Sequence, residues 1–136
     1  MFSLQKLLGK EDKFFHLLEA SAEETRSSVH ALVNLSKDLG HPAQAQESAY
    51  ARHRDRQITD QITTAVYAAS ITTIQREDIL ALSNALYRIT KAAHKFTERA
   101  LTAPHFVQAV DFSQQIALLD AASDIVLRMV KSLCAG

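Results

Sequence analysis

The chain has 136 residues, a length that predicts one domain over residues 1–136 and the burial of roughly two-thirds of the unfolded surface. The 15 Lys and Arg residues balance 15 Asp and Glu residues, so net charge favours neither nucleic acid nor an anionic membrane as a partner. The single cysteine, Cys134, excludes an internal disulfide, and no apolar stretch approaches the ~20 residues of a membrane span, so we expect a cytoplasmic protein.

Sparse turn-forming residues divide the chain into four long helices. Gly40-His41-Pro42 and Ala103-Pro104 are two breaks, because glycine and proline end helices. The β-branched run at 71–74 is a third, and Glu77 and Asp78 after it suit a first helical turn. The expected helices span residues 11–39, 42–70, 75–102 and 105–134. Because the connections are short, the sequence predicts an all-α, antiparallel up-down bundle of four long helices.

Apolar residues at helical spacing indicate the inward side of the first three helices. The third helix carries the clearest seam, formed by Ile79, Leu82, Leu86, Ile89, Ala93, Phe96 and Ala100. The first helix offers Phe14, Leu18, Thr25, Val29 and Leu32. The second offers Ile58, Ile62, Ala65 and Ala69, but upstream only Ala51 continues its line.

The fourth helix is apolar around most of its girth, with a narrow polar stripe of Asp120, Asp124, Arg128 and Lys131. One apolar line runs through Phe112, Leu119, Ala122, Val126, Met129 and Leu133, and a second runs through Val107, Val110, Leu118, Ala121 and Ile125. Such a helix is buried on two sides, and its neighbours can cover only one. We therefore expect a homodimer through the fourth helix, with an interface of Phe112, Leu119, Val126, Met129 and Leu133.

The residue patterns favour no enzyme and no cofactor. The sequence has no HExxH motif, no Glu-x-x-His motif of di-iron bundles and no glycine-rich phosphate loop. His94 follows the seam residue Ala93 and is interpreted as a flank residue. Cys134 lies in the last turn with no evident histidine or basic partner to lower its pKa, so it is interpreted as an inert thiol.

The densest charge lies in the run 52–56, Arg-His-Arg-Asp-Arg, on the second helix. On a helical wheel Arg54 and Asp55 lie near the inward seam, whereas Arg52 and Arg56 point outward or to a flank. One interpretation is a solvated, self-paired surface. The other adds two residues beside the third-helix seam, Tyr87 and Lys91, so that the four residues form a patch that binds an anion or an acidic partner: Arg52, Arg56, Tyr87 and Lys91.

Two stretches resemble the PhoU-like phosphate-transport regulators of the DUF47 type. Residues 10–15, KEDKFF, resemble the start of that family's first helix. Residues 71–86, ITTIQREDILALSNAL, resemble its turn and third-helix start, usually written ITPIDREDIHALASAL. The resemblance covers about residues 1–100. It implies a PhoU-like fold and a non-catalytic regulatory role beside an inorganic phosphate permease, with membrane contact only through that partner.

The chain departs from this family in two ways, as a short and divergent member. Related proteins bind metal through acidic i,i+4 pairs, but the matching positions here are Arg52 with Arg56 and Tyr87 with Lys91, so no metal site is carried over. Family members usually add two helices that pack against the fourth. Two alternatives stay open: a metal-binding module with ligands moved to Asp120 and Asp124, and a purely structural bundle that only oligomerises.

Overall fold

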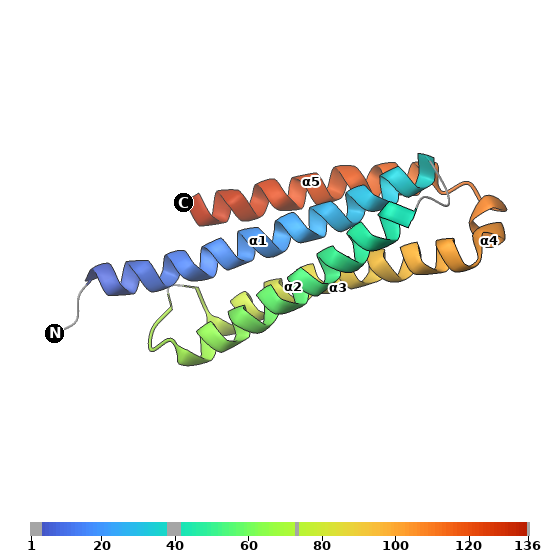
Figure 1. The fold of residues 1–136 in the computed structure, drawn as a ribbon. Coiled ribbons are helices and arrows are strands. Elements are labelled where there is room, and N and C mark those ends of the chain that lie inside the picture. Colours follow the sequence, from blue (N-terminus) through green and yellow to red (C-terminus); the bar gives the residue numbers. More distant parts are fainter. Residues whose placement is uncertain (1–3, 38–41, 73, 136) are drawn as a thin grey trace.

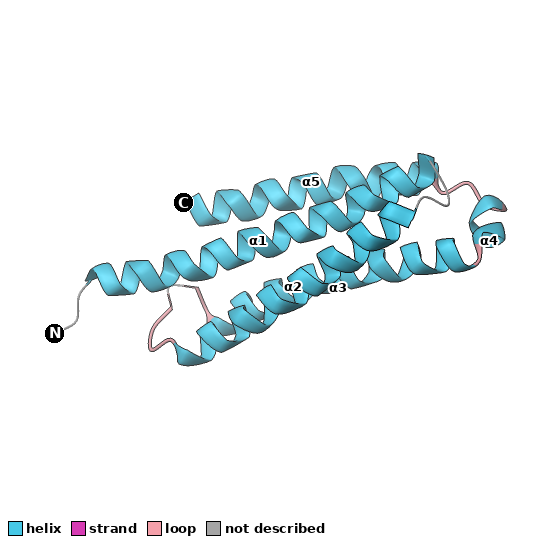
Figure 2. Cartoon of the chain, in the orientation of Figure 1, coloured by secondary structure: helices cyan, strands magenta, loops and turns pink. Residues whose placement is uncertain are grey.

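The computed structural model describes residues 4–37, 42–72 and 74–135 (Figures 1 and 2). They form α1 (Leu4–Lys37), α2 (Pro42–Ala68), α3 (Arg76–Thr102), the short α4 (Pro104–Gln108) and α5 (Ser113–Ala135). These described ranges contain no strand, and the long helices pack together as a bundle, which confirms the predicted all-α architecture. No helix within them is long and apolar enough to cross a membrane.

Helices α1, α2 and α3 contact one another pairwise and form the main body of the bundle. Helix α5 lies along α1 (Figure 1), and among the described residues it makes no close backbone contact with α2 or α3. The predicted seams of α1 and α2 are buried at Phe14, Leu18, Val29, Ile62 and Ala69. The predicted seam of α3 divides: half of it is fully buried, and Leu82, Ile89 and Phe96 are half-buried.

The connection between α2 and α3 is closed by an arginine. Arg76, the first residue of α3, donates a guanidinium hydrogen bond to the Ser70 carbonyl at 3.0 Å and another to the Ala69 carbonyl. These carbonyls follow the end of α2, where helical acceptors lack partners, so a cation there stabilises the helix end. The predicted break at 71–74 and the acidic first turn at Glu77 and Asp78 are confirmed.

Two predicted helix limits are corrected. Helix α1 begins at Leu4 rather than at residue 11, and a glycine inside it at position 9 costs only about 1 kcal/mol. The fourth helix does not run unbroken from residue 105 to 134: it divides into α4 and α5. Asp111 causes the division, because its Oδ1 accepts the Ser113 N–H at 3.0 Å and starts α5 afresh. The expected α1 limit at residue 39 lies outside the described residues.

The inward side of α5 is neither of the two predicted apolar lines. Its fully buried residues are Ile116, Ser123 and Val130. Ion pairs with α1 lie beside this buried line: Arg26 of α1 binds Asp120 and lies 3.8 Å from Asp124, and Lys131 lies 3.6 Å from Glu23. The polar stripe therefore lies at the edge of the α1 contact, whereas several large apolar residues, including Leu118, Ile125 and Met129, are exposed.

Candidate functional site

The basic run on α2 divides between three directions. Asp55 points inward and is fully buried. Arg54 points toward α1, where it lies 3.1 Å from Glu24, and its guanidinium stands 5.6 Å from the centre of the Tyr50 ring. Arg52 is half-buried and Arg56 is exposed. Because one helical residue turns 100°, both lie on the flank of α2 opposite Arg54, away from Glu24.

The register between α2 and α3 brings the predicted anion-binding residues to the same levels. Ser48 Oγ of α2 lies 3.1 Å from His94 Nδ1 of α3, and the two helices run antiparallel. Arg52 and Arg56 follow Ser48 by four and eight residues, so they lie about level with Lys91 and Tyr87, which precede His94 by three and seven residues. Within the described ranges no hydrogen bond or ion pair links these four side chains to one another.

Several basic side chains elsewhere in the bundle are held by carboxylates. These are Arg26, Arg54, Arg128 and Lys131. In contrast, none of the ion pairs formed by the described residues involves Arg52, Arg56 or Lys91. The α2–α3 flank therefore carries positive charge that no ion pair of the described residues neutralises, and such a surface attracts anions.

A buried polar cluster fills the centre of the three-helix body. The Ser21 hydroxyl of α1 donates to Asp55 Oδ1 at 2.6 Å, while Asp55 Oδ2 has no hydrogen-bond partner among the described residues. Burial raises the pKa of the Asp55 carboxyl, and the nearby Ser21 and Thr90 hydroxyls partly oppose this. The hydroxyls of Thr25 and Thr90 lie 2.9 Å apart and join α1 to α3. Asp55 thus supports the core and cannot reach a ligand in solvent.

Ser48, His94 and Glu98 form a line that resembles the relay of a serine hydrolase. His94 Nε2 lies 2.9 Å from Glu98 Oε1, and its other nitrogen faces Ser48. Ser48 is fully buried and stands inside a helix, whose N–H groups are committed to helical hydrogen bonds. Its hydroxyl cannot reach a substrate, so the line is structural. His94 is 6% exposed, which corrects its interpretation as a flank residue.

The relocated metal ligands proposed from sequence are already engaged. Arg26 lies against both Asp120 and Asp124, so a cation there would compete with a guanidinium. Within the described residues no three His, Cys, Asp or Glu side chains come close enough to hold a metal ion. The Cys134 thiol donates to the Phe15 carbonyl at 3.3 Å, and burial together with Glu19 raises its pKa to about 11.

The residues predicted for an oligomer interface fall on two sides of α5. Phe112 and Val126 are half-buried against the core. Met129 is 64% exposed, Leu133 is 45% exposed and Leu119 is 38% exposed. Two residues of the second apolar line, Leu118 and Ile125, are exposed on the same face as Met129. The hydropathy pattern contained both, but it could not show which line faces outward.

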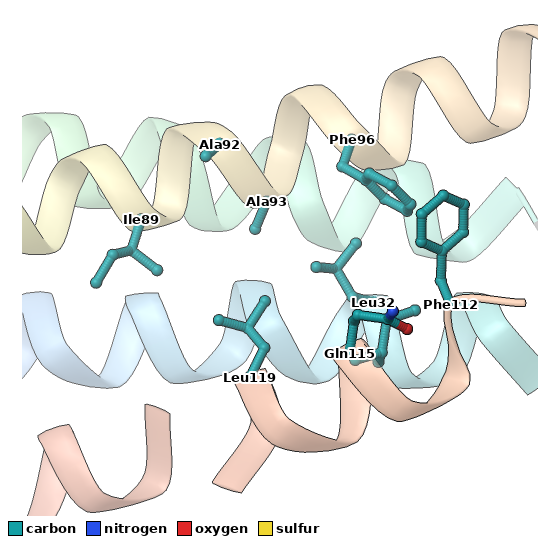
Figure 3. A pocket seen from close by; sticks show the side chains of 9 residues that line it. Leu32, Ile89, Ala92, Ala93, Phe96, Phe112, Gln115 and Leu119 are labelled. Carbon is teal, nitrogen blue, oxygen red and sulfur yellow. The ribbon is translucent and has the colours of Figure 1, made fainter. Parts of the chain in front are cut away.

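An apolar groove lies between α3 and α5, and Leu32 of α1 lines its floor (Figure 3). Ile89, Ala92 and Phe96 line it from α3, while Leu119 and Gln115 line it from α5. Its volume is about 380 Å³. The rings of Phe96 and Phe112 meet edge to face at one end, with centroids 5.5 Å apart. This contact bridges the groove at its end, and the rest stays open.

No protein-family model matches the chain, and neither does any curated protein or solved structure. Two surfaces of the bundle therefore stand as candidates for function on their own geometry. One is the basic flank, formed by Arg52, Arg56, Tyr87 and Lys91 on α2 and α3. The other is the apolar groove between α3 and α5.

Proposed function

We propose that this protein is a non-catalytic accessory protein that binds a phosphate-type oxyanion on the basic flank of α2 and α3. The observation that carries the proposal is that Arg52 and Arg56 lie about level with Lys91 and Tyr87 along the two helices. Among the described residues, no carboxylate forms an ion pair with Arg52, Arg56 or Lys91. Guanidinium groups present paired N–H donors that match the oxygens of phosphate. A tyrosine hydroxyl adds one neutral donor.

The resemblance to PhoU-like regulators gives this chemistry a biological setting. The family's acidic pairs suit a metal cation, whereas the basic residues at those positions repel one and attract an oxyanion. We therefore propose a role in regulating inorganic phosphate transport, with a phosphate permease as a partner and no contact with nucleic acid. We place the protein in the cytoplasm, where its single thiol suits a reducing environment. An acidic segment of the permease could occupy the same flank.

Two groups that could suggest catalysis are buried. In the row formed by Ser48, His94 and Glu98 the serine is fully buried. The carboxylate of Asp55 is fully buried as well. Neither group can meet a substrate, and the helical N–H groups around them offer no oxyanion hole. Binding, followed by transmission to a partner, is the activity that the exposed residues support.

Titration calorimetry with inorganic phosphate and with polyphosphate at low salt tests the anion site. The double variant Arg52→Glu/Arg56→Glu should weaken binding at least about tenfold, since each charge-assisted contact contributes about 1.5–3 kcal/mol and 1.4 kcal/mol is tenfold. Added salt should weaken binding by the wild type, because the flank is exposed.

The matched control is Lys13→Glu/Lys37→Glu, which makes the same change in net charge at two exposed positions of α1. It should leave binding within about twofold of the wild type if the flank is a specific site. Equal losses in both double variants would show non-specific charge attraction and would reject the site. No binding of either anion by the wild type would reject the proposed function itself.

A further inference from the structure

The fourth long helix leaves the bundle open along one side. Helix α5 packs on α1, and among the described residues it makes no close backbone contact with α2 or α3. The groove between α3 and α5 is therefore a vacant position, bounded by three helices (Figure 3). Its described lining includes one polar side chain, Gln115, and is otherwise aliphatic or aromatic. Apolar surface of this kind is unfavourable in water, so an apolar helix is the occupant that it suits.

The outer face of α5 has the properties of such an occupant. Leu118, Ile125, Met129 and Leu133 are exposed at spacings of seven, four and four residues, which places them on one side of the helix. Ala122 lies between them. The charged residues of α5 lie on the other side, where Asp120 and Lys131 pair with α1. The outer face therefore presents a stripe of large apolar side chains with no charge among them.

This stripe adjoins the groove, because Leu119 belongs to the edge of both. We propose that the groove of each copy binds helix α5 of a second copy, in a two-fold symmetric dimer. A partner α5 lying between α3 and α5 would face α1, α3 and α5, and would complete a closed four-helix arrangement. The two-fold axis then places the first α5 in the groove of the second copy. Such an interface is self-complementary and closes without leading to filaments.

This proposal makes residues of α3 part of the interface, which distinguishes it from simple contact between two α5 helices. Ala92 is exposed on the α3 wall, where a small side chain allows close approach of a helix. Ile89 and Phe96 stand on either side of it along α3 (Figure 3). The dimer is independent of the anion site, because Arg52 and Arg56 take no part in it.

Light scattering coupled to size exclusion, and sedimentation equilibrium at about 1–100 µM, test the dimer. The wild type should have twice the mass of one chain. Ile125→Glu/Met129→Glu on α5 and, separately, Ala92→Glu on α3 should each weaken dimerisation at least about tenfold and give monomers at low micromolar concentration. Far-ultraviolet circular dichroism should show unchanged helix content, since all three positions are exposed.

Two control substitutions introduce the same charge outside the interface. Ala117→Glu lies on the side of α5 that carries the ion pairs, and Asn84→Glu is exposed on α3 away from the groove. Both should remain dimers. A monomeric wild type across the whole concentration range would overturn the proposal. Dimerisation that is lost on changing α5 but unaffected by Ala92→Glu would overturn the occupation of the groove. Binding of inorganic phosphate by Ile125→Glu/Met129→Glu, whose changes lie on α5, should equal that of the wild type.

Discussion

Replacing Asp55 by asparagine should stabilise the protein at neutral pH. The carboxyl is fully buried and one oxygen, Oδ2, has no hydrogen-bond partner among the described residues. An unpartnered buried acceptor costs about 1–3 kcal/mol, and more when it is charged. Asparagine keeps the acceptor that Ser21 uses, although it loses the extra strength of a charged acceptor, about 1 kcal/mol. We expect a net gain of about 1–2 kcal/mol, or about 4–8 °C in Tm.

The pH dependence of this effect has a defined sign. Burial raises the pKa of Asp55 above its ordinary value of 3.8, so the folded protein binds the proton more tightly than the unfolded chain does. Its stabilising contribution is complete below pH 3.8 and is lost as the pH rises through the folded-state pKa. Burial also raises the pKa of Glu24, despite the opposing charge of Arg54, and adds in the same direction. The advantage of asparagine should therefore grow with pH.

Urea unfolding followed by circular dichroism, at several values between about pH 4.5 and about pH 8, measures this difference. Asp60→Asn is the matched control, because Asp60 lies on the same helix and is exposed. It should change the free energy of unfolding by less than about 0.5 kcal/mol. A lower stability of Asp55→Asn at every pH, with the wild-type pH profile retained, would refute the reasoning. It would mean that the folded protein satisfies a charged Asp55.

Two further predictions concern the contact between α1 and α5. Arg26→Ala should lower the free energy of unfolding by about 1 kcal/mol, because it removes a partner of Asp120 and Asp124. Arg128→Ala should lower it by less than about 0.5 kcal/mol, since that side chain is 71% exposed. Urea denaturation measures both, and equal effects would contradict a stabilising role of the Arg26 ion pairs. A Cys134 pKa of about 11 against the ordinary 9.0 predicts alkylation by iodoacetamide at pH 7 about a hundredfold slower in the native protein than in urea, and equal rates would contradict it.

Periodicity predicted the inward sides of α1, α2 and α3 because each has one narrow apolar seam. It could not do the same for α5, whose apolar residues surround most of the helix. There the residues that contact α5 lie on another helix: Ile116 and Val130 pack into the core, and Arg26 and Glu23 form ion pairs beside them. Hydropathy along one segment carries no information about such partners. The interface predicted from the sequence therefore includes exposed residues, such as Met129, together with the half-buried Phe112 and Val126.

The sequence also predicted the buried polar residues only in part. The α2 seam weakens at the level of Asp55, which the wheel placed near the inward side and the structure buries completely. What makes that burial tolerable is the set of hydroxyl groups on the neighbouring helices, including Ser21, Thr25 and Thr90. Ser21, which donates to Asp55, lies 34 residues away in the chain. For the same reason, the line from Ser48 to His94 became visible only when α2 and α3 were set in register.

Helix α3 belongs to both candidate surfaces, but through different flanks. Ile89, Ala92 and Phe96 face the groove shared with α5. Tyr87 and Lys91 lie away from the groove, on the flank toward α2, because each is two residues, a turn of about 200°, from Ile89. A helix bound in the groove would therefore leave the basic flank accessible. In a two-fold dimer the two flanks would lie on the outside of the particle, so each dimer would present two oxyanion sites. A long polyphosphate chain that reached both would bind more tightly than inorganic phosphate without any new contact.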